Sequence, residues 1–128
     1  MKLDGGRIMA LAAALLALGT LFGAYGTHAL RGELPPDRLE FYMTAVHYQF
    51  INALGLLGVG LAARQIDSAV LRAAAAVLFA GVVLFSGSLY CMTLDAPRAL
   101  GAVTAVGGMA LVVGWALFAW VVWNSRQR

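Results

Sequence analysis

Charged side chains are missing from most of this sequence. Four long apolar stretches, about 8–30, 42–63, 73–94 and 99–122, contain no Asp, Glu, Lys or Arg. Each stretch is longer than the roughly 20 residues that a helix needs to cross the hydrocarbon layer of a bilayer, which is roughly 30 Å thick. They therefore predict four membrane-spanning helices. The same absence excludes ion coupling through an intramembrane carboxylate, because no such group lies inside the predicted spans.

Cysteine and catalytic motifs are also scarce. Cys91 is the only cysteine, so an intramolecular disulfide is impossible. The sequence has no Ser–His–acid set, no phosphate loop and no motif of paired carboxylates, and we predict that the protein is not an enzyme. The net charge of +3 comes without a basic run or a basic helix face, so nucleic acid is not expected as a partner. We expect no cofactor and no metal.

The connections between the stretches are short. Short connections force consecutive helices to lie antiparallel and adjacent, so residues 1–128 are predicted to form one domain, an all-α up-down four-helix bundle in the membrane. Asp37 and Glu40 have the spacing of a capping box at the start of the second helix. Asp67 or Ser68 can cap the third helix, and Pro97 is placed to begin the fourth.

The first stretch has the polarity of a signal peptide, because Lys2 and Arg7 precede an apolar run. The run is longer than the roughly 7–15 residues of a signal core, and we expect it to remain as a span. Lys and Arg counts then predict the orientation. One side would carry Lys2, Arg7, Arg64, Arg72, Arg126 and Arg128, and the other only Arg31, Arg38 and Arg98. Both termini are therefore predicted to face the cytoplasm, in the cell (inner) membrane.

Small residues form stripes along the predicted helices. In lipid, helix association depends on close approach of backbones, so interfaces favour small side chains. The glycines expected at helix contacts are Gly19, Gly23, Gly26, Gly55, Gly58, Gly81, Gly101 and Gly108. Packing within one chain is the simpler interpretation of the GxxxG element at Gly19 and Gly23. Homodimerisation through the same two residues is the alternative.

Hydrogen-bonding side chains concentrate in the outer half of the predicted bundle. A candidate polar pocket consists of Tyr25, His28, Thr44, His47, Tyr48, Gln49, Asn52, Ser86, Ser88, Tyr90 and Thr104. The inner half is almost wholly apolar, and Tyr42 and Trp123 are typical of interfacial belts. An unpaired amide or imidazole in hydrocarbon costs several kcal/mol. These groups are therefore expected to form either an interhelical network or a pocket open to the outer leaflet.

The two histidines raise the possibility of a bound haem or metal. His28 and His47 would lie on adjacent helices near the same membrane face. No Cys pair, carboxylate or third ligand accompanies them, and an isolated His pair is a weak ligand set. An interfacial or network position is the commoner situation for such histidines.

Five ordered motifs carry a family resemblance: residues 23–30 (GAYGTHAL), 44–49 (TAVHYQ), 85–90 (FSGSLY), 104–108 (TAVGG) and 114–115 (GW). With them the chain resembles the small membrane proteins catalogued as domain of unknown function 423, which include the eukaryotic transmembrane protein 256. The resemblance implies four spans and no established activity. Asn52 stands where this family usually has His, which weakens a metal or haem site. Ala105 stands where Pro often follows the Thr.

Three functional classes are compatible with these features. An accessory or assembly subunit would pack its apolar and small-residue faces against a larger membrane complex. A lipid- or quinone-binding protein would use the outer polar pocket. An oligomeric small-molecule transporter is the third class, and the missing intramembrane carboxylate and the apolar inner half argue against it. The lipid bilayer is the expected environment, with a larger complex or a homo-oligomer as the partner.

Overall fold

The computed structural model describes residues 2–126, which form helices joined by short connections. The elements are α1 (Gly5–Tyr25), η1 (Gly26–Leu30), α2 (Pro36–Ala63), α3 (Ala69–Thr93) and α4 (Leu100–Ser125). The π-helical turn η1 continues α1, and α1 with η1 and the other three helices are each long and apolar enough to cross a membrane. Each predicted apolar stretch lies within one of them, apart from Leu94 and Ala99 just beyond a helix end. Arg128, which entered the orientation count, lies outside the described residues.

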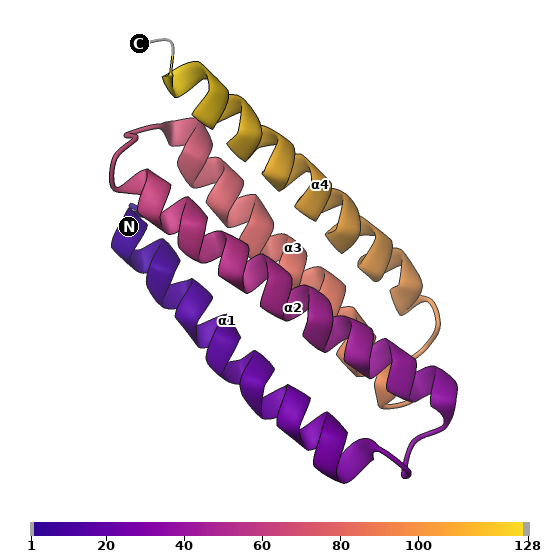
Figure 1. Ribbon diagram of the computed structural model, residues 1–128. Helices are drawn as coiled ribbons and strands as arrows, with labels where there is room; N and C mark the ends of the chain where they lie inside the picture. Colours follow the sequence, from indigo (N-terminus) through magenta and orange to yellow (C-terminus); the bar gives the residue numbers. More distant parts are fainter. Residues whose placement is uncertain (1, 127–128) are drawn as a thin grey trace.

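Consecutive helices run antiparallel and pack against one another, α1 on α2, α2 on α3 and α3 on α4. Figure 1 shows α1 and α4 on opposite sides of the central α2–α3 pair, with both ends of the chain at the same end of the bundle. The prediction of an all-α up-down membrane bundle is therefore confirmed. The side of the membrane on which the termini lie stays a prediction.

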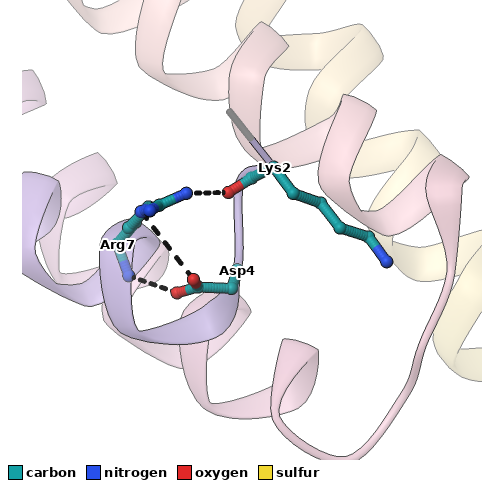
Figure 2. A network of polar contacts seen from close by, with 3 residues as sticks. All are labelled: Lys2, Asp4 and Arg7. Atoms are coloured by element: carbon teal, nitrogen blue, oxygen red, sulfur yellow. Dashed lines mark hydrogen bonds and ion pairs between the residues drawn. The ribbon is translucent and has the colours of Figure 1, made fainter.

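Local hydrogen bonds begin α1. The Asp4 carboxylate accepts from the backbone N–H of Arg7 at 2.9 Å and so caps the first turn. The Arg7 guanidinium donates to the Lys2 carbonyl at 2.5 Å and lies 3.8 Å from the Asp4 carboxylate (Figure 2). These contacts are local, so they fix the start of the helix without joining it to another element.

The other helix starts only partly follow the sequence prediction. Ser68 caps α3 by accepting from a backbone N–H at 3.3 Å, as expected. The predicted capping box of α2 is wrong, because Pro35 is the N-cap and no side chain caps this helix. Pro36 at the first position lacks an N–H and needs no acceptor there. The helix α4 begins at Leu100, three residues after Pro97, because the intervening residues form tight turns.

Ion pairs close the two ends of the bundle. Arg38 at the start of α2 pairs with Asp95 in the α3–α4 connection. At the other end Arg72 binds Asp67 at 2.5 Å, and this hydrogen bond, helped by the charge of Lys2, holds the pKa of Asp67 below its usual value. A lowered carboxyl pKa means that the pair stabilises the fold at neutral pH. Its contribution is lost as the pH falls through that lowered pKa.

Backbones approach most closely between α3 and α4. A Cβ on Gly107 would lie 2.4 Å from the backbone nitrogen of Phe85, and one on Gly81 would lie 2.9 Å from the Leu111 side chain. A second close approach joins α1 to α2, where a Cβ on Gly5 would lie 2.5 Å from the carbonyl oxygen of Gly60. Close approach of this kind replaces the hydrophobic effect as a source of helix association in lipid.

The glycines expected at helix contacts divide into two groups. Gly19 and Gly23 face Phe50 of α2, so the GxxxG element packs within the chain. Four others also lie against side chains of another element, namely Gly26, Gly55, Gly81 and Gly108. A Cβ on Gly58 or Gly101 would meet nothing within 4 Å. Periodicity placed these two on packing stripes, but it cannot tell which side of a stripe a neighbouring helix covers.

Gly107→Ala should destabilise the protein by about 1–3 kcal/mol, because the added methyl would overlap backbone atoms that cannot move aside. Gly101→Ala is the matched control on the same helix, and its stability should be unchanged or slightly higher, since Ala is the better helix former. Unfolding of both variants in detergent, followed by circular dichroism, measures the difference. Equal stabilities of the two variants would contradict the close α3–α4 contact.

Candidate functional site

Gln49 joins three helices in the half of the bundle away from the termini, which is called the outer half below after its predicted orientation. Its side chain on α2 is buried, and its amide nitrogen donates to the Leu15 carbonyl of α1 at 2.8 Å. Its amide oxygen accepts from the hydroxyl of Tyr90 on α3 at 2.6 Å. The amide nitrogen and the amide oxygen thus each bond to a different neighbouring helix. This is the pairing that a polar side chain in hydrocarbon requires.

Tyr42 holds the outer end of α1. Its hydroxyl donates to the Phe22 carbonyl, just before the π-helical turn, in which Arg31 N–H bonds to the Gly26 carbonyl at 3.0 Å. Only glycine fits at position 26, because an added Cβ would lie 2.5 Å from the Tyr42 ring. The Tyr90 ring packs edge-on against both aromatic neighbours, with centroids 5.0 Å from Phe22 and 5.3 Å from Tyr42.

Asn52 and Trp115 connect α2 to α4. The Asn52 amide nitrogen donates to the Tyr48 carbonyl, and its oxygen accepts from the indole N–H of Trp115, both at 2.9 Å. The indole ring lies directly over Gly55, where a Cβ would be 2.3 Å from it. The missing side chain at Gly55 therefore makes room for Trp115, and the amide one turn earlier orients it.

Small hydroxyl side chains make the remaining polar contacts between helices. Ser86 on α3 donates to the Ala45 carbonyl of α2 at 2.8 Å. The hydroxyls of Ser88 and Thr104 lie 2.5 Å apart and join α3 to α4. Each hydroxyl also lies within hydrogen-bond distance of a carbonyl of its own helix, at 2.9 Å and 3.2 Å, and because each has a single proton, only one of them donates to its carbonyl while the other donates across to the neighbouring hydroxyl. Serine and threonine in membrane helices commonly bond in this way.

Each buried polar side-chain atom of the interior thus has a partner. Within residues 2–126, no buried side-chain nitrogen or oxygen lacks a hydrogen-bond partner. The same part of the chain contains no group of three His, Cys, Asp or Glu side chains that could hold a metal ion.

Four residues of the candidate pocket lie apart from this network, on the exposed surface of the bundle. Tyr25 and Tyr48 are 57% and 43% exposed, and His28 and His47 are also exposed. Half-buried Thr44 lies beside His47 and Tyr48 along an open hollow of about 580 Å³ on α2. The structure therefore brings together six of the eleven residues in hydrogen bonds between helices and leaves the others outside. These six are Gln49, Asn52, Ser86, Ser88, Tyr90 and Thr104.

Sequence reasoning missed two members of the network. Tyr42 was assigned to an interfacial belt, but it is 6% exposed and bonds to α1. Trp115 was grouped with the apolar inner half, although its indole N–H reaches Asn52. The position of Trp115 could have been predicted, because an indole ring needs space and Gly55, which has no side chain, lies near the same depth of the bundle as Trp115. The carbonyl acceptors on Leu15 and Ala45 leave no trace in a side-chain pattern.

These features define a multi-pass membrane protein with four helical spans and a hydrogen-bonded outer half. The chain belongs to the family described as protein of unknown function (DUF423), whose model matches residues 22–108, so the resemblance seen in the sequence is confirmed. It is 41% identical over 103 residues to the UPF0382 membrane protein YwdK of Bacillus subtilis, covering 80% of this chain and 82% of that protein. It is 37% identical over 95 residues to the UPF0382 inner membrane protein YgdD of Escherichia coli, covering 74% and 72%. No solved structure matches the chain.

The family segment contains most of the network. The four motifs within residues 22–108 hold both partners of three contacts between helices, Gln49 with Tyr90, Ser86 with Ala45 and Ser88 with Thr104. The fifth motif contributes Trp115. Several of the residues that carry the resemblance therefore make hydrogen bonds between helices in this chain.

Gln49→Leu should destabilise the protein by about 1.2 kcal/mol, because it removes two hydrogen bonds between membrane helices, each worth about 0.6 kcal/mol on average. The added Tyr90→Phe change should recover part of the loss, because it removes the orphaned hydroxyl. His47→Leu, two positions away and exposed, is the control and should leave stability unchanged. Equilibrium unfolding in mixed micelles measures all three, and equal effects of Gln49→Leu and His47→Leu would rule out the pairing.

Asn52→Leu should move the fluorescence of Trp115 to shorter wavelengths, because the indole loses its hydrogen-bond acceptor. The measurement uses protein in which Trp120 and Trp123 are replaced by Phe, so that Trp115 is the only emitter. Asn124→Leu, near the end of the same helix as Trp115, serves as the control and should leave the spectrum unchanged. An identical spectrum in the Asn52 variant would show that the indole does not bond there.

Proposed function

We propose that the chain is a non-enzymatic accessory or assembly subunit that docks a larger membrane-protein complex against the exposed face of α2. The observation that carries this proposal is a heptad stripe of exposed residues on that face. The stripe, called the α2 face below, consists of His47, Ile51, Leu54 and Gly58. All four residues are exposed, and Ile51 and Leu54 are more than half exposed.

The spacing of the α2 face is that of a helix-packing seam. Positions 47, 51, 54 and 58 are separated by four, three and four residues, which is the repeat of left-handed helix pairs. Membrane bundles mostly pack with this geometry. Gly58 leaves an open notch, because a Cβ there would meet nothing within 4 Å. A seam with a notch accommodates a second helix more closely than it accommodates mobile lipid tails.

His47 favours a protein neighbour over lipid on this face. It lies five residues inside the charge-free stretch that begins at residue 42, about 7.5 Å along the helix at 1.5 Å per residue. An ionisable side chain at such depth is rare on a lipid-facing surface, where it has no partner. A docked helix with a carbonyl or hydroxyl at the same depth would provide one.

A second unpartnered stripe lies on α3. It has the same spacing and consists of Ala69, Ala73, Ala76, Ala80, Val83 and Gly87. The first five are exposed and Gly87 is half-buried. Two seams on the two central helices support a role in which the chain bridges other helices. The paired interior supports the same role, because it leaves outward surfaces as the means of interaction.

The location follows from the same proposal. We infer an inner-membrane position from the printed description of the Escherichia coli relative as an inner membrane protein. We also infer cytoplasmic termini from the excess of Lys and Arg at that end of the bundle. The docking partner would then be another integral protein of that membrane.

Gly58→Leu should release the partner while leaving the isolated chain folded, because the side chain fits the open space in the chain but fills the notch. Gly101→Leu is the matched control, since that glycine also has nothing within 4 Å of an added Cβ. Affinity purification in mild detergent, with the mass of each complex measured by light scattering, compares the two variants with the unaltered protein. We expect a stoichiometric larger partner that is lost only in Gly58→Leu.

Two results would contradict the docking proposal. A lone chain or homo-oligomer that carries bound lipid or quinone would favour ligand binding at the outer polar residues instead. Proton-driven uptake by the purified protein in liposomes would favour transport, and would exclude both other functions.

A further inference from the structure

A hollow separates the ends of α2 and α4 at the end of the bundle that carries both termini. It has a volume of about 690 Å³ and is open along one side. Leu61 and Ile66 line it from the α2 side, and Trp115, Phe118 and Trp123 line it from α4. Arg126 lines it at the end nearest the termini. This space is called the α2–α4 groove below, and none of the residues that line it belongs to the α2 face.

We propose that the α2–α4 groove binds one anionic phospholipid, with an acyl chain along the aromatic wall and the phosphate at Arg126. The groove matches one leaflet in length. From Trp115 to Arg126 it follows α4 for about 16 Å at 1.5 Å per residue. Half of the ~30 Å hydrocarbon layer is about 15 Å. An acyl chain that starts at the interface beside Arg126 therefore ends near Trp115 at the middle of the bilayer.

The wall of the groove is rigid and apolar. Trp115 is held by Asn52 and packs edge-on against Phe118, with ring centroids 6.0 Å apart. Trp123, nearer the mouth, is 69% exposed. Fixed aromatic rings lose little conformational freedom when a chain packs on them, which favours a resident lipid over one that exchanges freely.

The mouth of the groove has the charge that a phosphate needs. Among the lining residues within 2–126, Arg126 is the only charged one, and Gln65 adds an amide that can donate a hydrogen bond. The nearby carboxylates of Asp4 and Asp67 pair with Arg7 and Arg72 instead. A guanidinium binds phosphate oxygens in a forked geometry, and basic pockets between membrane helices are known to bind anionic head groups.

The helix ends themselves do not supply this attraction. Both α2 and α4 end at the groove mouth, and the carbonyls at a helix C-terminus carry partial negative charge. Among the described lining residues, Arg126 therefore supplies the charge that attracts a phosphate, and the Gln65 amide adds a neutral donor. Replacing Arg126 removes this charge and tests the proposal.

The test uses the tryptophans as reporters, in full-length protein reconstituted into vesicles. Trp120 lines a neighbouring hollow, so Trp120→Phe leaves emission only from Trp115 and Trp123 in the groove. Brominated acyl chains quench a tryptophan that they touch. Vesicles of phosphatidylcholine and phosphatidylglycerol are prepared with the bromine on one lipid or on the other, at equal mole fractions.

We expect brominated phosphatidylglycerol to quench the groove tryptophans more strongly than brominated phosphatidylcholine. Arg126→Gln should reduce this preference about five-fold, the effect of one basic residue beside anionic lipid. Arg126→Lys should keep most of it. Lys2→Gln removes the same charge at the same end of the bundle but outside the groove, and should retain the preference.

Three results would overturn the proposal. Equal quenching by the two lipids would mean that the groove holds ordinary shell lipid. No quenching by either would mean that a second copy or another protein fills it. An equal loss in Lys2→Gln would mean that general surface charge attracts the lipid. None of these outcomes concerns the α2 face, so this test and the partner purification fail independently.

Discussion

The requirement that polar groups in hydrocarbon find partners inside the protein governs this structure. Gln49 satisfies it by bonding to two helices at once, and Asn52 satisfies it by bonding to its own helix and to Trp115. Each bond is weak, at about 0.6 kcal/mol on average between membrane helices. Its geometric effect is larger than its energy, because a misplaced helix would leave several such groups unpaired at once. The polar residues therefore specify one arrangement of helices that apolar packing alone would not distinguish from its neighbours.

The two halves of the bundle solve the packing problem differently. In the outer half, side-chain hydrogen bonds connect the helices. Towards the inner end, α1 and α2 meet through the glycine pair Gly5 and Gly60, whose backbones lie almost in contact. Gly107 and Gly81 allow a similarly close approach of the helices α3 and α4, nearer the middle of the bundle. The interior side chains contact one another. The surfaces that remain for other molecules are the α2 face, the α3 stripe and the α2–α4 groove.

The fold was largely predictable from the sequence, because the absence of charge from four stretches leaves few alternatives in a membrane. The contacts were less predictable. Gln49 and Tyr90 were recognised as polar groups needing partners, but the carbonyl of Leu15 is common to every residue and gives no signal. Gly58 and Gly107 show a second limit. Both lie on small-residue stripes, yet only Gly107 meets a neighbouring backbone, and the rotation of a helix about its axis decides which. That rotation is set by contacts among all the helices together.

The order of the chain has a consequence for its synthesis. Polar groups of α2 enter the membrane before the residues that satisfy them, since Tyr90 belongs to the third span and Trp115 to the fourth. Until those spans arrive, Gln49 can bond only to α1, and the Asn52 oxygen has no indole to accept from. The second helix therefore reaches its final rotation late, when the last helix is inserted. A ribosome stalled after three spans would hold an inserted bundle in which Asn52 does not yet bond to Trp115.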